Sequence, residues 1–210
     1  MIETLHYITQ DHPKKSHAGL CREACMAGVK CVQLRLKDTE DFDWEQEAVE
    51  CKEIVEEFGA KLIINDNVEV AQRVFADGVH LGQQDMSVLE ARSILGNNIL
   101  IGGTANTIED IEQLYKQGAD YIGLGPFKFT STKKALSPIL GLEGYRSIVK
   151  MLKKSTIPIL GIGGIELEDI PTLLKTGIHG IALSGLITHA ENKPELVKQI
   201  KQHITEGKHT

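Results

Sequence analysis

The stretch QGADYIGLG at residues 117–125 decides which fold the sequence predicts. It reads as the end of a helix that runs directly into a short, buried strand. Similar stretches occur as AGVKCVQLR (27–35), ADGVHLG (76–82) and TGIHGIALS (176–184). Each returns after roughly two strand-helix units, which indicates parallel strands joined by helical crossovers.

Eight runs have the composition of short buried strands: LHYIT (5–9), CVQLRL (31–36), KLIIND (61–66), GVHLG (78–82), ILIGG (99–103), DYIGLG (120–125), IPILGIG (157–163) and GIALSG (180–185). The segments between them have helical periodicity, which is clearest in 42–58, where apolar residues recur every three or four positions. Ser87 and Glu90 predict a capping box at the start of a helix over 87–95, and Gly96 is typical of the residue that follows a helix.

These units predict an α/β fold, a single-domain (β/α)8 barrel over residues 1–204 with a short C-terminal tail at 205–210. Strands rich in Val, Ile and Leu are typical of parallel strands that are covered on both faces. A closed ring also leaves no edge strand to protect. No linker or low-complexity run divides the chain. A doubly wound open sheet is the structural alternative.

Length and composition exclude several classes of protein. The chain has 210 residues, 41% hydrophobic and 25% charged, and no apolar run approaches the ~18–20 residues that span a bilayer. We therefore expect a soluble globular protein without membrane partners. With 29 acidic and 23 basic residues the net charge is -6, so no overall positive field attracts nucleic acid.

Cysteine usage and the N-terminal sequence predict a reducing compartment. Cys21, Cys25, Cys31 and Cys51 contain no CxxC pair, and a chain of this length buries a core without disulfides. Reduced, packed thiols are the expectation. The first residues, MIETLHYIT, lack the basic and then apolar pattern of a signal peptide, so a cytoplasmic location is predicted.

Polar or glycine residues follow seven consecutive predicted strands, at the carboxyl ends where barrels of this type carry their chemistry. They are Gln33, Arg35 and Lys37; Asn65 and Asp66; Gly82 to Asp85; Gly102, Gly103 and Thr104; Thr130 to Lys134; Gly161 to Gly164; and Leu183, Ser184 and Gly185. Taken singly, Arg35 and Lys37 also fit a solvated strand end, and Asp85 also fits the start of a helix. Their convergence on one rim favours a site. His80 lies within a strand and is expected to be packed rather than catalytic.

The residue types at this rim predict a phosphorylated ligand and a metal. Arg35, Lys37 and Lys133 supply cations, and the glycine-rich ends of the last two strands suit phosphate binding by backbone N–H groups. Two ionised carboxylates such as Asp66 and Asp85 within ~4 Å would repel by about 4 kcal/mol at an effective dielectric of ~20, so a cation between them is expected. Oxygen ligands beside phosphates favour Mg²⁺, and no cysteine or histidine cluster has zinc spacing.

Together these motifs resemble the thiamine phosphate synthase family. The matching pieces are QLRLKD (33–38), IINDNVEVA (63–71), ADGVHLGQQD (76–85), GADYIGLGPFKFTSTK (118–133), ILGIGGI (159–165) and GIALSGLI (180–187). The resemblance implies a transferase that joins the pyrimidine of hydroxymethylpyrimidine diphosphate to hydroxyethylthiazole phosphate, forming thiamine phosphate and pyrophosphate. It also implies a dissociative reaction, in which diphosphate departs before the thiazole nitrogen attacks the pyrimidine methylene cation.

The resemblance further implies roles for individual residues. For the pyrimidine diphosphate these are Gln33, Leu34, Arg35, Leu36, Lys37, Asn65, Thr104 and Lys133, of which Arg35, Lys37 and Lys133 stabilise the departing diphosphate. For the thiazole phosphate they are Thr130, Ser131, Thr132, Gly164, Leu183 and Ser184, and for Mg²⁺ they are Asp66 and Asp85. No nucleophile-base pair is evident, and an aromatic nitrogen that attacks a cation needs none.

Two positions depart from the family pattern. Thr104 replaces the usual serine but keeps the hydroxyl group. Asn106 stands where histidine is common, so any role that needs a titrating ring there is absent. The segment 127–138 fits either a lid over the site or a solvent-exposed loop.

Two other functions compete with the synthase. The thiazole tautomerase shares the barrel but lacks a carboxylate like Asp66 and uses a histidine near the position of Asn106. A catalytically silent barrel that binds thiamine phosphates is disfavoured because both aspartates and the cationic side chains are retained. The sequence leaves open whether the protein forms a homo-oligomer and whether a thiazole carboxylate is accepted.

Overall fold

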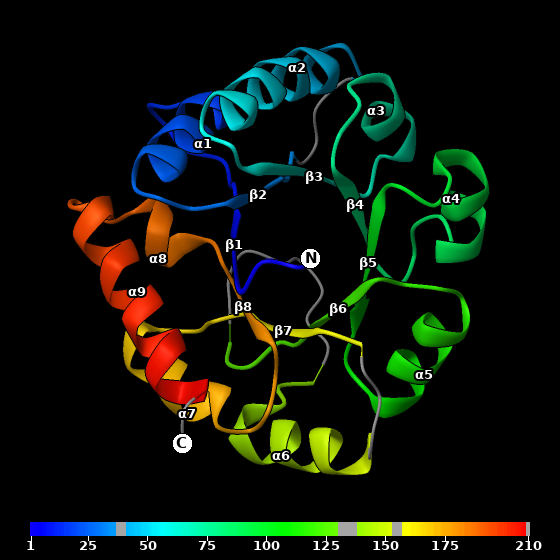
Figure 1. The fold of residues 1–210 in the computed structure, drawn as a ribbon, viewed down its shortest axis with the longest axis vertical. Helices are drawn as coiled ribbons and strands as arrows, with labels where there is room; N and C mark the ends of the chain where they lie inside the picture. The colour runs from blue at the N-terminus through cyan, green and yellow to red at the C-terminus, as the bar shows by residue number, and fades with distance from the viewer. Residues whose placement is uncertain (37–40, 130–137, 153–156, 209–210) are drawn as a thin grey trace.

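The fold is a closed barrel of eight parallel strands, as the sequence predicts (Figure 1). The computed structural model describes residues 1–36, 41–129, 138–152 and 157–208. The strands are β1 (Leu5–Ile8), β2 (Cys31–Leu34), β3 (Lys61–Asn65), β4 (Gly78–Leu81), β5 (Leu100–Ala105), β6 (Tyr121–Leu124), β7 (Ile159–Ile162) and β8 (Gly180–Leu183). Because β8 pairs with β1, placing Ile181 opposite Leu5, the open-sheet alternative is wrong.

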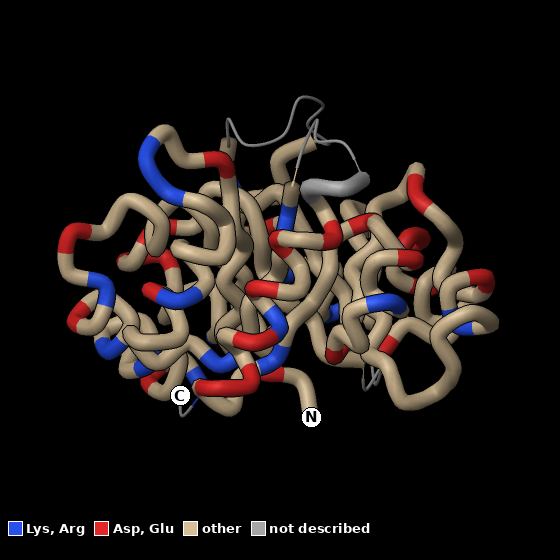
Figure 2. The backbone as a smooth tube through the Cα atoms, turned by 90° about the horizontal axis from the view of Figure 1, so that it is seen from above, with Lys and Arg blue, Asp and Glu red and all other residues tan. Residues whose placement is uncertain are grey.

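A ring of helices surrounds the barrel (Figure 1). They are α1 (His17–Met26), α2 (Asp41–Glu57), α3 (Val68–Arg73), α4 (Val88–Leu95), α5 (Ile108–Lys116), α6 (Gly141–Met151), α7 (Ile170–Leu174), α8 (Gly185–Thr188) and α9 (Lys193–Lys208), with a 3-10 turn, η1 (Leu167–Asp169), before α7. The chain start and the end of α9 lie on the same side of the barrel (Figure 2).

The final helix corrects one expectation. Residues 205–208, expected to be part of a C-terminal tail, continue α9. Ile204 and Gly207 are buried there, and a Cβ on Gly207 would lie 2.6 Å from the Cβ of Leu174 in α7. The absence of a side chain at Gly207 therefore allows the last turn of α9 to pack closely against α7.

Local sequence signals explain where two of the helices lie. Ser87 caps α4 in a capping box with Glu90, and Gly96 follows the helix with a φ of 75°. In α2 the periodic residues Trp44 and Ala48 are buried in the hydrophobic core. Both helices therefore lie where the sequence predicts them.

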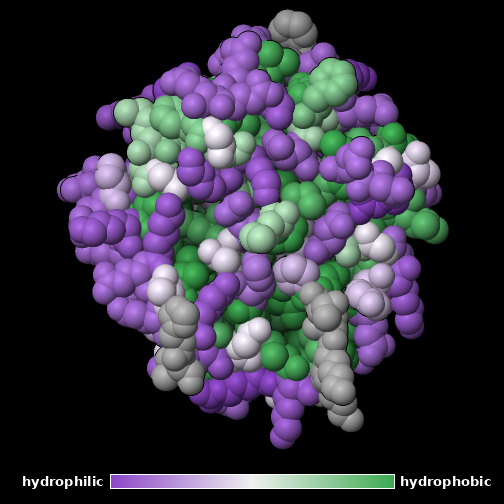
Figure 3. All heavy atoms as spheres, viewed as in Figure 1, coloured by the Kyte–Doolittle hydropathy of each residue, from purple (hydrophilic) through white to green (hydrophobic). Residues whose placement is uncertain are grey.

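The core lies between the strands and the helix ring. All four cysteines are buried and free of disulfides, which confirms the prediction of packed thiols. On the face drawn in Figure 3, hydrophilic residues form most of the periphery and hydrophobic residues show between them. Basic and acidic positions are interspersed along the chain (Figure 2). Within the described ranges, no helix has the length and apolar character needed to cross a membrane.

Two aspartates join neighbouring strands at their amino-terminal ends. Asp77 precedes β4, and its carboxylate accepts a hydrogen bond from the N–H of Leu62 at 2.9 Å. Asp120 precedes β6 and accepts one from the N–H of Ile101 at 2.7 Å. These residues occupy matching places in ADGVHLG and QGADYIGLG, so part of the internal repeat arises from one repeated hydrogen bond.

The Asp120 contact extends to α4 through Arg92. The guanidinium lies 2.6 Å from the Asp120 carboxylate and also donates to the carbonyls of Ile99 and Gly118. Only 18% of the Arg92 side chain is exposed. Removal of the carboxylate would therefore leave a mostly buried cation without its counter-charge and the N–H of Ile101 without its acceptor.

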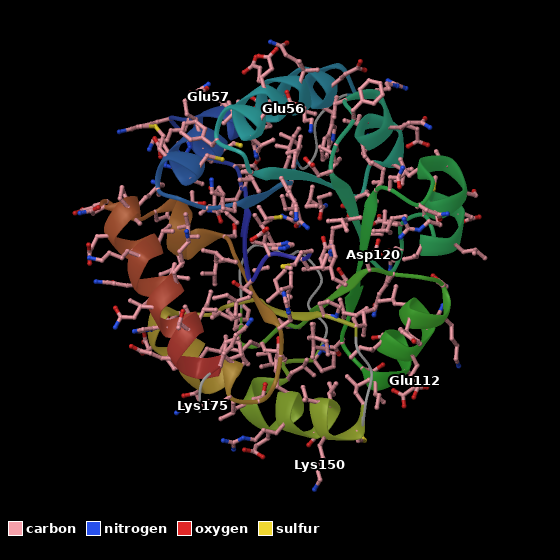
Figure 4. The ribbon with its side chains drawn as sticks, in the orientation of Figure 1. Glu56, Glu57, Glu112, Asp120, Lys150 and Lys175 are labelled. Atoms are coloured by element: carbon pink, nitrogen blue, oxygen red, sulfur yellow. The ribbon has the colours of Figure 1, made fainter. Side chains whose placement is uncertain are left out.

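We expect Asp120→Ala to lower the free energy of unfolding by about 1–3 kcal/mol, because buried donors lose their partner. Glu112→Ala is the control, since Glu112 points away from the barrel on α5 whereas Asp120 lies inside the helix ring (Figure 4). The control change should stay within about 0.5 kcal/mol. Urea unfolding measures both. Equal stabilities of the two variants would contradict the proposed role of Asp120.

Candidate active site

A cavity of about 690 Å³ opens at the carboxyl ends of the strands. Residues in or just after every strand of the barrel contribute to its wall, from Ile8 of β1 to Leu183 of β8. Seven of the residues to which the family resemblance assigns a role line it: Gln33, Arg35, Asn65, Thr104, Gly164, Leu183 and Ser184. These seven residues of the predicted rim therefore share one cavity.

Other predicted residues lie elsewhere. The side chains of Leu34 and Leu36 pack into the hydrophobic core, so only their backbone is free to serve the site. Side chains alternate along a strand, and Gln33 and Arg35 face the cavity for the same reason. Lys37, Lys133 and the Thr130–Thr132 run lie outside the described residues, as does most of the segment predicted as a lid or loop.

Arg35 is the cation that the structure places in the cavity wall on the β2 side. Its backbone N–H donates to the Thr9 hydroxyl at 3.0 Å. Burial lowers the pKa of Arg35, while the charges of Asp66 and Asp11 act in the opposite direction. A partly desolvated guanidinium attracts an anion more strongly than one in bulk water, because the surrounding dielectric is lower.

Asp66 and Asp85 follow neighbouring strands but do not line the cavity itself. Asp66 adopts a φ of 66° directly after β3, and its N–H donates to the carbonyl of His80 at 2.8 Å. The Asp85 carboxylate accepts from the N–H of Gly82 at 2.6 Å. Both residues are exposed and belong to the β3 and β4 side of the rim.

This donor set matches Mg²⁺ in its chemistry. Both side chains offer carboxylate oxygens, which are the ligands that this ion prefers. Over the described part of the chain, no group of three or more His, Cys, Asp or Glu residues has a metal-binding arrangement. Two carboxylates leave positions for water and for phosphate oxygens, and Mg²⁺ commonly binds in this way at phosphate-handling sites.

Below the cavity, His80 connects the wall to the barrel interior. It is buried, as expected, but it also lines the cavity, which the sequence reasoning missed. Its Nε2 lies 3.0 Å from the Thr104 hydroxyl and its Nδ1 lies 3.2 Å from the Tyr121 hydroxyl. Side chains alternate along β4, so the side chain at position 80 faces the barrel interior. This alternation is the sequence signal that could have placed His80 at the cavity.

The glycines after β7 form a second wall of the cavity. Gly163 and Gly164 have φ values of 91° and 65°. The Lys128 N–H donates to the Gly163 carbonyl at 2.9 Å, and a Cβ on Gly164 would lie 2.6 Å from the Phe129 carbonyl oxygen. Glycine is therefore required at both positions, because the turn needs positive φ values and because the chain that follows β6 passes close to the turn.

Four further polar residues line the cavity without having been predicted, namely Gln10, Lys128, Glu166 and His189. Ser184 donates to the Gln10 side chain at 2.8 Å, and Gln10 lies 2.9 Å from Nε2 of His189. The Lys128 ammonium lies 2.7 Å from the Asp169 carboxylate, which raises its pKa. These contacts join residues that are distant in sequence, so no local pattern indicates them.

Asn106 has a structural place that a histidine would not reproduce. Its side-chain Nδ2 donates to the carbonyls of Gly125 and Pro138, both at 2.9 Å. The backbone N–H of Asn106 donates to Asp110. One nitrogen with two hydrogens therefore joins the end of β5 to both ends of the β6–α6 connection. Unlike an imidazole, the amide does not take up or release a proton near neutral pH.

Comparison with known proteins decides the family. The family model described as thiamine monophosphate synthase matches residues 5–187, which include all eight strands. The chain belongs to this family. The resemblance inferred from the motifs is thereby confirmed, and the protein is an enzyme of the transferase class.

Individual relatives of the thiamine monophosphate synthase family match over nearly their whole length. The thiamine-phosphate synthase of Phocaeicola vulgatus is 50% identical over 198 residues, which cover 93% of this chain and 95% of the relative. That of Flavobacterium psychrophilum is 47% identical over 206 residues, covering 97% and 100%. The solved thiamine phosphate pyrophosphorylase from Pyrococcus furiosus superposes with a TM-score of 0.86 at 31% identity, covering 98% of this chain and 96% of that chain.

The close contacts at Gly164 should make this position sensitive to substitution. Gly164→Ala should destabilise the fold by more than Gly59→Ala, because both glycines have positive φ values, 65° and 56°, but only Gly164 faces a close backbone oxygen. Left-handed strain common to both costs about 1–2 kcal/mol. Thermal unfolding of the two variants isolates the steric part, and equal losses would show that the Phe129 carbonyl moves aside easily.

Proposed function

We propose that this enzyme joins the methylene carbon of 4-amino-2-methyl-5-hydroxymethylpyrimidine diphosphate to the ring nitrogen of 4-methyl-5-hydroxyethylthiazole phosphate. The products are thiamine phosphate and pyrophosphate. The observation that carries the proposal is the convergence in one cavity of Arg35, of uncharged polar side chains and of a glycine turn, in a chain of the thiamine monophosphate synthase family.

The two ends of the cavity suit the two substrates. Gln33, Asn65 and Thr104 provide amide and hydroxyl groups for a polar heteroaromatic ring, with Arg35 beside them for its diphosphate. On the opposite side, Gly164 and Ser184 line the cavity where a phosphate would meet backbone N–H groups and a hydroxyl. This division orients the thiazole ring towards the pyrimidine methylene carbon.

The reaction needs charge stabilisation more than proton transfer. The C–O bond to the diphosphate breaks with its electron pair leaving on oxygen, and the thiazole nitrogen then donates its lone pair to the resulting carbon cation. No proton has to move in either step. Arg35 stabilises the departing charge, and we assign the same role to Lys37 and Lys133 from the family motifs. The cavity wall aligns the rings and limits access of water to the cation.

Asp66 and Asp85 are the residues that would hold Mg²⁺ beside the diphosphate. When bound, the ion would neutralise phosphate charge and so make the diphosphate a better leaving group. Asp85 keeps its orientation through the Gly82 N–H, and Asp66 through the backbone bond to β4.

The direct test supplies both substrates with Mg²⁺ and follows pyrophosphate and thiamine phosphate together. We expect both products in equal amounts, and we expect EDTA to abolish both. Pyrophosphate without thiamine phosphate would contradict the acceptor site. Turnover that EDTA does not affect would contradict the metal assignment, and folded protein that forms neither product would contradict the proposed function.

Asp85→Asn separates the charge of this residue from its structural contact. The amide oxygen still accepts from Gly82, so the loop should keep its shape, whereas the charge is lost. We expect turnover to fall by about 10²–10³-fold, the usual effect of losing one preorganised electrostatic contact. Glu69→Ala, an exposed acid on α3, is the control and should retain full turnover. Near-normal turnover of Asp85→Asn would refute its role at the metal.

A further inference from the structure

Three polar side chains form a hydrogen-bonded chain in the cavity wall where β8 meets β1. Gln10 follows β1, Ser184 follows β8 and His189 follows α8, and all three line the cavity. The Ser184 hydroxyl lies 2.8 Å from Oε1 of Gln10, and Nε2 of Gln10 lies 2.9 Å from Nε2 of His189. The Gln10 amide therefore stands between the other two side chains and contacts both.

The short helix α8 fixes the spacing of Ser184 and His189. The Ser184 carbonyl accepts from the N–H of Thr188, and the Gly185 carbonyl accepts from the N–H of His189, both at 3.0 Å. Oε1 of Gln10 and Cδ2 of His189 lie 3.7 and 3.8 Å from the point where a Cβ on Gly185 would stand. Gln10 reaches this helix from β1, so its amide can rotate about its last torsion without moving either partner.

The proton positions in this arrangement follow from the chemistry of each group. An amide nitrogen only donates, so Nε2 of His189 accepts from Gln10, and a neutral imidazole then has its proton on Nδ1. An amide oxygen only accepts, so the Ser184 hydroxyl donates its single proton to Gln10. Ser184 consequently presents lone pairs to the cavity.

A phosphate monoester needs the opposite from this wall. Its dianion, the main form above a second pKa of ~6, carries acceptor oxygens and no proton. When the Gln10 amide makes half a turn, its NH₂ group donates to Ser184 and its oxygen accepts from His189. The Ser184 proton is then released to point at the phosphate, and the ring proton of His189 must lie on Nε2. The orientation of the amide thus links the phosphate to the tautomer of His189.

We propose that Gln10 and His189 are positioning residues for the phosphate of the second substrate. Phosphate binding turns the Gln10 amide, releases the Ser184 hydroxyl to donate, and moves the His189 proton from Nδ1 to Nε2. His189 is exposed, so its ring exchanges this proton with water and its charge does not change. The inference rests on the proposed function, which places the thiazole phosphate at Ser184. The wall thereby favours a group that only accepts hydrogen bonds.

The tautomer of His189 is the direct readout. Nitrogen NMR of the imidazole rings distinguishes a protonated ring nitrogen from an unprotonated one, and the measurement is made at about pH 8, where a free imidazole is neutral. Without ligand we expect the proton on Nδ1. With saturating inorganic phosphate or hydroxyethylthiazole phosphate we expect it on Nε2. Gln10→Met should remove this response, because the group that connects Ser184 to His189 is lost.

His12 is the internal control for this measurement. Its ring centroid lies 6.1 Å from that of His189, so it experiences much of the same field from a bound anion. Its Nδ1 accepts from the N–H of Lys14 at 3.2 Å, which keeps the proton of the neutral ring on Nε2. Its tautomer should therefore not respond to phosphate. Equal spectral changes at His12 and His189 would show a field effect alone and would overturn the inference.

Gln10→Met tests the same link in turnover. Methionine has a similar length but no amide, so we expect the KM for the thiazole phosphate to rise about 5-fold, the usual effect of one hydrogen bond. The KM for the pyrimidine diphosphate and kcat should keep their wild-type values. In the Ser184→Ala background the same substitution should have no further effect, because coupled residues are not additive. Gln199→Met, the same change at an exposed position of α9 outside the cavity, is the matched control and should leave both KM values unchanged.

The outcomes separate this inference from the proposed function. Wild-type turnover with a His189 tautomer that phosphate does not change overturns the inference and leaves the synthase activity intact. So does a rise in KM that persists in the Ser184→Ala background. A tautomer that responds to phosphate in protein without turnover supports the positioning role and overturns the proposed substrates. The NMR measurement on the wild-type protein needs no variant, so it decides the question even where Gln10→Met does not fold.

Discussion

Closure of the barrel by the pairing of β8 with β1 is the constraint on which the rest of the structure depends. With all strands parallel and paired in sequence order, their carboxyl ends meet at one rim. Residues as distant as Gln10 and Ser184 come within hydrogen-bonding distance only because the last strand returns to the first. The cavity is therefore a product of closure, and no single segment contains it.

The two ends of the barrel divide stability from chemistry. At the amino-terminal end, Asp77 and Asp120 use their carboxylates to hold neighbouring strand amides. At the carboxyl end, Asp66 and Asp85 extend beyond the strands and are exposed. The same residue type therefore holds strand amides at one end of the barrel and stands exposed beyond the strands at the other.

The barrel interior between these ends contains a layer of polar side chains that is buried. The Tyr121 ring lies within contact distance of His6 and of His80, with centroids 5.4 and 5.5 Å apart. Buried polar groups are costly unless they are hydrogen-bonded, and His80 and Tyr121 meet this need by bonding to each other. The layer contacts the cavity wall through the hydrogen bond between His80 and Thr104.

The sequence by itself determined the eight strands, the caps of α4, the packed cysteines and the rim residues such as Arg35 and Thr104, because strand alternation, capping and turn glycines are local signals. Only the tertiary structure decided the partners of Lys128, Gln10 and His189 and the inward contacts of His80. The same holds for the hydrogen bonds that the Asn106 side chain donates across the β6–α6 connection. It also decided that α9 runs to Lys208, since burial against α7 overrides a polar sequence. Local propensity acts over a few residues, whereas these contacts join positions far apart in the chain and exist only once the barrel has closed.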